Sequence, residues 1–166
     1  MFREFADLFA KDIIQLGRTN LVIHKIYTED ILLISSQPYS VSITEQAFIN
    51  KEVQWMLDNK LIKDSTSLWA SPVVLVMKKN RKKRFCVDYK KLNAITKKDS
   101  YLLLWINKLL GSLVEATYFF TLDLMSRYWQ VMMHPADREK TAFITKYSTY
   151  KFNIMLFELC NASATF

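Results

Sequence analysis

Glycine and proline are scarce in this 166-residue sequence, which contains only two glycines and three prolines. An average protein of this length has about 12 glycines and about 8 prolines. Loops that bind phosphate through glycine need several glycines close together, whereas Gly17 and Gly111 lie far apart. The composition therefore excludes P-loops, dinucleotide-binding fingerprints, collagen-like repeats and low-complexity linkers.

Cysteine and histidine are also rare, with two residues of each. The two cysteines, Cys86 and Cys160, are far apart in the sequence. Together with His24 and His134 they form neither the spacing of a zinc site nor a disulfide framework. A reducing compartment is the default expectation for such a chain.

Long hydrophobic runs are missing as well. The first 12 residues contain five charged side chains, so they do not form the apolar core of a signal peptide. The most apolar helical stretch, residues 101–110, is too short to span a bilayer and contains Asn107 and Lys108. We expect an intracellular chain, in the cytoplasm or the nucleus, without a membrane segment.

Positive charge is concentrated in residues 78–98. This window holds ten basic residues and one acidic residue, whereas the other 145 residues hold 13 basic and 15 acidic ones. The net charge of +7 therefore comes from one local patch. Such a patch indicates a polyanionic partner such as nucleic acid. A solvated hairpin rim explains the composition equally well.

Apolar spacing and capping signals predict helices in three places. Residues 1–16 have an amphipathic helical pattern that ends at Gly17, and residues 18–42 indicate an extended connector. Ser42 is expected to cap a helix that runs to about residue 60, because Glu45 completes a capping box. A further helix is predicted over residues 101–113.

Strand signals dominate the rest of the chain. Residues 73–77 and 84–88 predict a β-hairpin with a cationic tip, in which Asn80 takes the left-handed turn position. Residues 161–166 are typical of the first turn of a helix. The mixture of helices and strands indicates an α/β or α+β fold. Further strands are predicted at residues 118–124, 129–133, 141–145 and 150–155.

Asp123 is the carboxylate that suggests chemistry. It stands in the apolar stretch 118–124, where an ionised acid is costly unless it is paired, protonated or bound to a cation. A metal ligand is one interpretation. An aspartate at the end or edge of a strand, facing water, is the other.

Several segments resemble the reverse transcriptase of gypsy-type LTR retrotransposons. The similarity extends over nearly the whole chain, including LGRTNL at 16–21, which resembles the linker between the protease and polymerase regions of that family. The matching segments are WASPVVLV at 69–76, RFCVDYKKLN at 84–93, KKDSY at 97–101, TLDL at 121–124, YWQ at 128–130, EKTAFIT at 139–145 and FELCNASATF at 157–166.

The resemblance implies an α+β, right-hand polymerase fold. Residues 1–41 would be the linker, 42–117 the fingers, and 118–166 the N-terminal half of the palm, ending before the family's Tyr-X-Asp-Asp hairpin. The ancestral activity would be RNA-directed DNA synthesis on an RNA or DNA template-primer, with deoxynucleotide triphosphates and Mg²⁺. The remainder of the polyprotein would be a further partner.

The resemblance also implies roles for individual residues. Asp123 matches the first catalytic aspartate, which binds the divalent metals. Tyr128 matches the gate residue under the incoming sugar, and Lys79 and Arg84 match the cations that hold the triphosphate. The basic patch would supply the contacts to nucleic acid, through Lys78, Arg81, Lys82, Lys83, Lys90 and Lys91.

Other features argue against activity of the chain by itself. Two-metal catalysis needs more than one carboxylate, and no Asp-Asp pair occurs in the 166 residues. We expect a fragment that does not polymerise alone. The alternatives are a nucleic-acid-binding module without catalysis and a non-functional, poorly folded relic of a transposable element.

The chain also departs from the family at positions where the family usually has proline, glycine or arginine. Each of these amino-acid differences can result from a single C-to-T or G-to-A change in a codon. This suggests the hypothesis that cytosine deamination damaged the coding sequence. If Glu158 replaces a glycine with φ > 0, the cost is about 1–2 kcal/mol. The positions are Leu68, Leu102, Leu104, Leu156 and Ser163 for proline, Arg127, Ser148 and Glu158 for glycine, and Trp105 for arginine.

Overall fold

The computed structural model describes residues 16–28, 33–100, 110–111, 113–114, 116–121 and 123–166. Two of the predicted helices, over 1–16 and over 101–113, lie wholly or mostly outside these residues. The described elements, in chain order, are β1 (Ile23–His24), α1 (Ile43–Asp58), β2 (Ile62–Asp64), β3 (Ser71–Met77), β4 (Lys83–Val87), α2 (Lys90–Ile95), the 3₁₀ helix η3 (Arg127–Gln130), β5 (Met132–Met133), the 3₁₀ helix η4 (Pro135–Thr141), β6 (Phe143–Ile144), β7 (Thr149–Phe152) and α4 (Ala162–Thr165).

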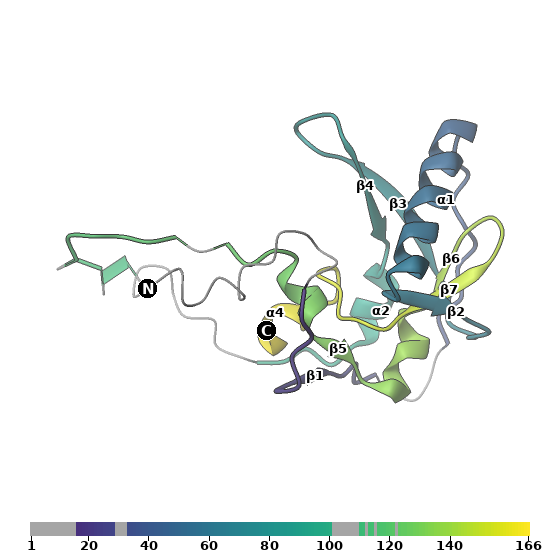
Figure 1. Ribbon diagram of the computed structural model, residues 1–166. Coiled ribbons are helices and arrows are strands. Elements are labelled where there is room, and N and C mark those ends of the chain that lie inside the picture. Colours follow the sequence, from purple (N-terminus) through teal and green to yellow (C-terminus); the bar gives the residue numbers. More distant parts are fainter. Residues whose placement is uncertain (1–15, 29–32, 101–109, 112, 115, 122) are drawn as a thin grey trace.

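A five-stranded mixed sheet forms the body of the molecule, with the strand order β2-β7-β6-β3-β4. The central strand β3 runs antiparallel to β4 and parallel to β6. Helix α1 lies against the sheet, and the β3–β4 hairpin projects beyond it (Figure 1). This mixture of helices and strands agrees with the predicted α+β class.

Helix α1 begins where the sequence predicts. The Ser42 Oγ accepts a hydrogen bond from the Glu45 amide at 3.3 Å, and the Glu45 carboxylate accepts one from the Ser42 amide at 3.1 Å. This reciprocal capping box satisfies two backbone donors that the first helical turn leaves without a partner. The buried face of the helix includes Ile49, Val53 and Met56.

The predicted hairpin is confirmed, but its turn differs from the prediction. Val74 pairs with Cys86, and the left-handed residue is Arg81, with φ of 60°, rather than Asn80. Asn80 instead uses its side chain to accept a hydrogen bond from the Lys82 amide at 3.2 Å. A type I turn followed by a left-handed residue is a common solution for a hairpin of this length. The turn leaves the cationic tip exposed.

The predicted strand over residues 118–124 is wrong for the described part of that segment. Residues 118–121, 123 and 124 are not in a strand, and their side chains are exposed. Tyr118 and Phe120 are 84% and 82% exposed. A strand needs a neighbour to accept and donate its backbone hydrogen bonds, and no described strand lies beside this segment. Composition suited to a strand does not supply that neighbour.

The later strands are shorter than predicted. The segment expected to be extended from residue 129 begins with η3, so only Met132–Met133 is strand there. Strands β6 and β7 confirm the predictions at 141–145 and 150–155 in shortened form. Helix α4 confirms the helical turn predicted at the end of the chain.

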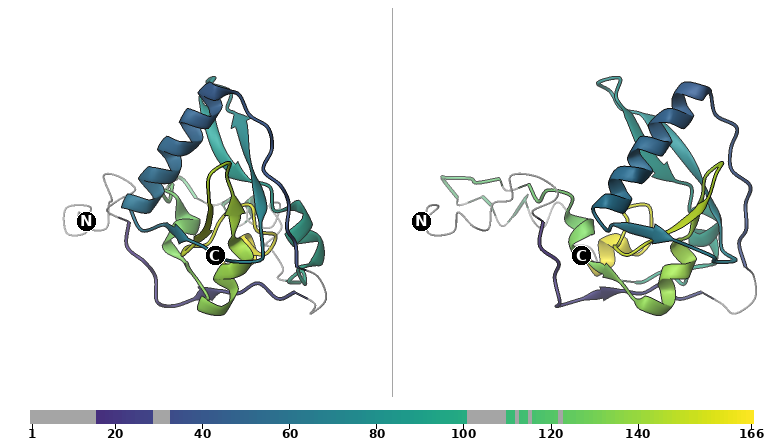
Figure 2. Two further views of the ribbon diagram at one scale, coloured as in Figure 1. Left: turned by 90° about the vertical axis from the view of Figure 1, so that its right-hand side faces the viewer. Right: turned by 45° about the vertical axis from the view of Figure 1, so that its right-hand side comes forward.

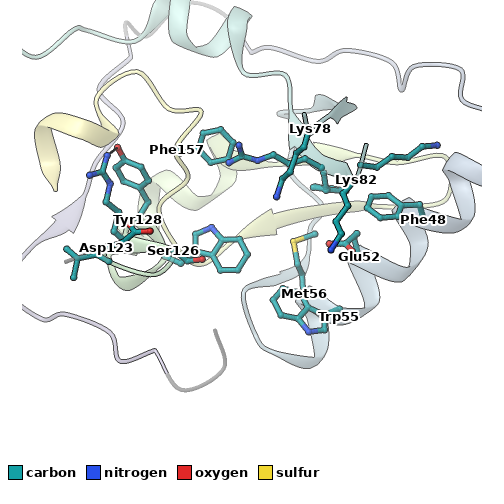
Figure 3. Close-up of a pocket in the computed structure, with 16 residues that line it drawn as sticks. Phe48, Glu52, Trp55, Met56, Lys78, Lys82, Asp123, Ser126, Tyr128 and Phe157 are labelled. Carbon is teal, nitrogen blue, oxygen red and sulfur yellow. Dashed lines mark hydrogen bonds between the residues drawn. The ribbon is translucent and has the colours of Figure 1, made fainter. Parts of the chain in front are cut away.

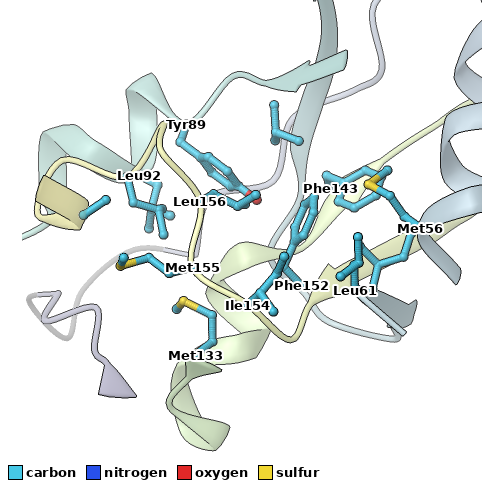
Figure 4. Close-up of a cluster of buried hydrophobic side chains, with 14 of the residues drawn as sticks. Met56, Leu61, Tyr89, Leu92, Met133, Phe143, Phe152, Ile154, Met155 and Leu156 are labelled. Atoms are coloured by element: carbon cyan, nitrogen blue, oxygen red, sulfur yellow. The ribbon is translucent and has the colours of Figure 1, made fainter. Parts of the chain in front are cut away.

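The core brings together residues from distant parts of the sequence (Figure 4). The rings of Phe143 and Phe152 are 5.1 Å apart, and Phe85 packs edge-on against Phe143 at 5.6 Å. The fully buried Tyr89 donates a hydrogen bond from its hydroxyl to the Thr141 carbonyl at 2.7 Å. The core therefore joins the hairpin to the strands β6 and β7.

The N-terminal segment, predicted as an extended connector, packs against this body. Strand β1 pairs with β5 in parallel, and His24 and Ile26 are each 2% exposed. One ring nitrogen of His24, Nδ1, lies 2.7 Å from the Thr165 Oγ1 in α4. The Ile26 amide donates to the Asp137 carboxylate at 3.2 Å. The two ends of the described chain therefore lie side by side (Figure 2).

Candidate nucleotide and nucleic-acid site

A groove of about 960 Å³ lies between α1, the β3–β4 hairpin and η3 (Figure 3). One wall is cationic, one is aromatic, and a carboxylate stands at one end. The lining residues are Phe48, Glu52, Trp55, Met56, Lys78, Lys82, Lys83, Arg84, Phe85, Asp123, Leu124, Ser126, Arg127, Tyr128, Trp129 and Phe157. The groove therefore contains both cationic groups that can bind an anion and aromatic rings that can pack against another ring or a sugar.

The cationic wall comes from the hairpin. The Arg84 guanidinium stacks over the Phe157 ring, 3.9 Å from its centroid, and Lys83 lies 3.3 Å from the Glu45 carboxylate. Lys78 and Lys82 also line the groove. β4 is the edge strand of the sheet, and three consecutive residues of it, Lys83, Arg84 and Phe85, line the groove.

The structure separates the other predicted cations from this wall. Lys79 and Arg81 lie at the exposed turn and do not line the groove. Lys90 and Lys91 line a second groove of about 570 Å³, which also contains Asp88. There the Lys91 ammonium donates to the Ser36 Oγ at 3.0 Å. The basic patch of the sequence is thus divided between two faces.

Tyr128 projects from η3 into the first groove and is held on several sides. The Arg127 Nη2 donates to its hydroxyl at 2.8 Å, and the Ser163 Oγ lies 3.1 Å from the same oxygen. The hydrogen bond between Tyr128 and Ser163, together with the one that Arg127 donates, lowers the pKa of Tyr128. The residue before η3, Ser126, has φ of 42°, a left-handed conformation that is uncommon for serine.

Asp123 lines the same groove, five positions before Tyr128, and is exposed to solvent. Its carboxylate is not buried among apolar strand neighbours, because the described residues around it are not in a strand. Figure 3 shows the other carboxylate of the lining, Glu52, on the opposite side of the groove from Asp123. Among the described residues, no group of three His, Cys, Asp or Glu side chains is close enough to hold a metal ion.

Glu158 lies behind the cationic wall, next to the lining residue Phe157. Burial raises the pKa of its carboxyl group, against the opposing effect of Arg84. Burial, together with the charge of Glu158, raises the pKa of the Cys86 thiol to about 11. The Asn93 side chain donates to the Glu158 carbonyl at 2.7 Å.

The backbone strain considered for Glu158 does not occur. Its φ is not positive, and neither is that of Arg127 or Ser148. The left-handed position near the groove is Ser126 instead. The cost of a charged residue at 158 therefore comes from burying a carboxylate, and not from a disallowed backbone.

Sequence reasoning missed the contacts that cross the chain. Phe157 under Arg84 and Ser163 on Tyr128 join residues that are 73 and 35 positions apart. The motifs FELC and NASATF identify these segments but contain no signal for their partners. Trp55, whose ring lies 6.1 Å from that of Trp129, was likewise not expected in the site.

A protein-family model matches more than half of this chain. The family model described as "Reverse transcriptase (RNA-dependent DNA polymerase)" matches residues 76–165, which include the hairpin turn, β4 and Tyr128. No described helix has the length and apolar character needed to cross a membrane.

Curated relatives include Pol polyproteins of fruit-fly transposons. The polyprotein from transposon 297 of Drosophila melanogaster is 36% identical over 100% of this chain, which covers 16% of that protein. The polyprotein from transposon gypsy of the same organism is 37% identical over 85% of the chain, which covers 14% of it. The chain therefore spans about one sixth of the length of these relatives.

Solved structures with the same fold include foamy-virus enzymes. The protease-reverse transcriptase of prototype foamy virus has a TM-score of 0.83 and 21% identity, covering 97% of this chain and 22% of that one. A foamy viral protease-reverse transcriptase in complex with an RNA/DNA hybrid gives a TM-score of 0.83 at 19% identity, with the same coverage of 97% and 22%. At this identity the likeness shows the fold.

Proposed function

Because this chain belongs to the reverse transcriptase (RNA-dependent DNA polymerase) family and is similar to transposon Pol polyproteins, we propose that it is a nucleotide- and template-binding part of such a polymerase. Residues 42–117 are proposed as fingers and 118–166 as part of the palm. The groove that brings Arg84, Tyr128 and Asp123 together carries the proposal.

Each of these residues has a proposed role in binding a deoxynucleotide. Arg84 contacts the triphosphate, because its planar guanidinium suits phosphate oxygens and Phe157 holds it in place. The Tyr128 ring packs against the sugar. Lys79, at the hairpin turn, is proposed as a second phosphate contact, which requires the flexible lysine side chain to reach over the rim of the groove.

Asp123 is proposed as one ligand of Mg²⁺, which prefers oxygen ligands. The described residues do not form a complete site, since Glu52 lies across the groove and no acidic cluster is present among them. The remaining ligands would have to come from outside the described residues. We therefore expect no nucleotide incorporation by this chain alone.

Nucleic acid is the proposed partner of the cationic wall. Lys78, Lys82 and Lys83 form a stripe of positive charge beside Arg84. Basic stripes of this kind bind the phosphate backbone. The complexes of foamy viral enzymes with duplex DNA and with an RNA/DNA hybrid support this partner for proteins of the same fold. Lys90 and Lys91 in the second groove are proposed as additional contacts, weakened by Asp88.

Nucleotide binding tests the proposal directly. Trp129 and Trp55 line the groove, so their fluorescence should change when dATP binds. R84A should weaken dATP binding by at least about tenfold, the effect of losing a charge-assisted hydrogen bond. K63A removes an exposed lysine of β2 that does not line the groove, and it should leave the affinity unchanged. Saturable binding that R84A does not affect would contradict the assigned triphosphate site.

A second candidate function is nucleic-acid binding without catalysis. It is favoured by the combination of a complete cationic wall with an incomplete metal site: Asp123 stands at one end of the groove, and the described residues offer no cluster of further metal ligands around it. Primer extension with the purified chain, Mg²⁺ and deoxynucleotides tests whether the chain has polymerase activity by itself, and dATP binding separates the two functions. Template-dependent synthesis that is lost in D123A would establish a polymerase. Because no synthesis is expected from this chain alone in either case, binding to the template-primer without binding of dATP would favour the second function.

The third alternative is a relic that does not fold. Exposed Tyr118 and Phe120 are consistent with it, whereas the capped α1 and the continuous core oppose it. A cooperative urea unfolding transition of the purified chain would eliminate it.

A further inference from the structure

The hydroxyl of Tyr128 is held more tightly than packing alone would require. A tyrosine hydroxyl can donate one hydrogen bond and accept two. Here the Arg127 Nη2 supplies one bond at 2.8 Å, and the Ser163 Oγ provides a second at 3.1 Å. Both partners come from elements that the chain folds together, η3 and α4. Two of the three hydrogen-bonding positions of the hydroxyl are therefore occupied.

The ring itself is also enclosed. The Arg127 guanidinium carbon lies 4.7 Å from the centroid of the Tyr128 ring and 5.5 Å from that of Phe166. Phe166 meets the Tyr128 ring edge-on, at 5.8 Å between centroids. Arg127 thus stacks on the tyrosine while it holds the hydroxyl. Arg127 and Tyr128 line the groove, whereas Ser163 and Phe166 do not and support the ring from outside the groove.

We propose that Arg127 and Ser163 are positioning residues that lock the Tyr128 ring, and that this lock sets how strongly the groove distinguishes deoxyribose from ribose. The proposal rests on the proposed role of Tyr128 under the nucleotide sugar. A ring that is free to rotate can move away from an added 2′-hydroxyl, whereas a ring fixed at its hydroxyl and face cannot. The lock is also specific to the residues of this chain, because glycine at 127 or proline at 163 would remove a hydrogen-bonding partner of the Tyr128 hydroxyl.

The first experiment tests whether Arg127 and Ser163 hold the Tyr128 hydroxyl, and it needs no nucleotide. In protein labelled with ¹³C at the tyrosine Cζ, the Tyr128 signal, assigned with Y128F, reports titration of the hydroxyl. We expect a Tyr128 pKa below its ordinary value, since Ser163 and Arg127 lower it, and a higher pKa in S163A and R127G. Tyr39, whose pKa is raised by its hydrogen bond to Asp88, is an internal reference that should not move. An unchanged Tyr128 pKa in both variants would overturn the lock.

The consequence for specificity is measured as the ratio of ATP to dATP dissociation constants, read from tryptophan fluorescence. S163A, which leaves the charge of the groove unchanged, should lower this ratio by about fivefold, the equivalent of one hydrogen bond of about 1 kcal/mol. R127G should lower it at least as much, and R127K should restore part of it because lysine keeps the charge and can donate. S36A, a serine-to-alanine change in the second groove, is the control.

The outcomes distinguish this inference from the proposed function. If the wild-type chain binds neither nucleotide, the proposed function fails, while the titration still decides whether Tyr128 is locked. If both nucleotides bind and the ratio is the same in wild type, S163A and R127G, the specificity role is wrong although the binding site stands. Ser163 is exposed in α4, and alanine is a good helix former there, so S163A should fold.

Discussion

Removing one charge from the cationic wall should change how nucleic-acid binding depends on salt. Lys82 is the residue to change, because its side chain is exposed and lines the groove. The hairpin contact at this position is made by the backbone, where the Lys82 carbonyl accepts a hydrogen bond from the Lys78 amide at 2.9 Å. K82A therefore removes a charge while the turn keeps its backbone bond.

The magnitude follows from the number of cations on the wall. Four basic residues of the hairpin line the groove: Lys78, Lys82, Lys83 and Arg84. Each phosphate contact contributes about −0.7 to the slope of log affinity against log salt for a single strand, so four give about −2.8. Between 50 and 200 mM salt, the affinity should then fall by about 50-fold in wild type and by about 20-fold in K82A. The contact of Lys83 with Glu45 makes the wild-type slope a little shallower.

Fluorescence anisotropy of a labelled 16-nucleotide single strand, titrated at four salt concentrations, measures both slopes. K63A, which removes the same charge from β2, should give the wild-type slope. Contacts by Lys90 or Lys91 would steepen every slope but leave the difference of about 0.7 between wild type and K82A. Equal slopes for wild type and K82A, or binding that does not depend on salt, would refute the assignment of the wall to phosphate contacts.

Three further predictions concern stability. S42A should destabilise the chain by about 1 kcal/mol in urea unfolding, because it removes the side chain that caps α1. Burial lowers the pKa of His24 from 6.5 to about 4, although the charge of Asp137 acts in the opposite direction. Between these two pH values the unfolded chain binds more protons than the folded chain. The free energy of unfolding should therefore fall by roughly 3 kcal/mol as the pH drops from 7 to below 4. H24Q should remove most of this pH dependence, and a wild-type profile that is flat over this range would contradict the burial of a neutral imidazole. Burial raises the pKa of Glu158, so the folded chain disfavours its ionised form. E158Q should therefore raise the urea midpoint of unfolding more at pH 8 than at pH 4. Equal shifts of the midpoint at both pH values would show that the carboxyl group is not desolvated.

Local signals predicted those parts of the fold that depend on neighbours in sequence. Ser42 and Glu45 are three residues apart, so their capping box forms within one helical turn and could be read directly. The hairpin of β3 and β4 also closes over a short turn. The left-handed residue was predicted as Asn80 and is Arg81. Asn80 instead accepts a hydrogen bond from the Lys82 amide with its side chain, and the sequence does not decide between these two local arrangements of the turn.

Residues 118–124 show the limit of such signals. Their alternation and aromatic content favour a strand, yet the described residues provide no partner strand, and Asp123 is exposed. Strand formation is a property of a pair of segments, and the pattern of one segment reports only its suitability. The same limit applies to the segment around β1, where composition suggested a connector and tertiary contacts bury His24 and Ile26.

By itself, the sequence determined the family, through motifs that lie between residues 16 and 166, and the chemical types of the site residues Asp123, Tyr128 and Arg84. The tertiary structure decided which of the basic residues share a groove with them. It placed Lys78, Lys82 and Lys83 there and Lys90 and Lys91 elsewhere. It also brought Ser163 to the hydroxyl of Tyr128, 35 residues away. The physical reason is that charge and residue type are local properties, whereas the space that side chains share depends on how the strands pair and the core packs.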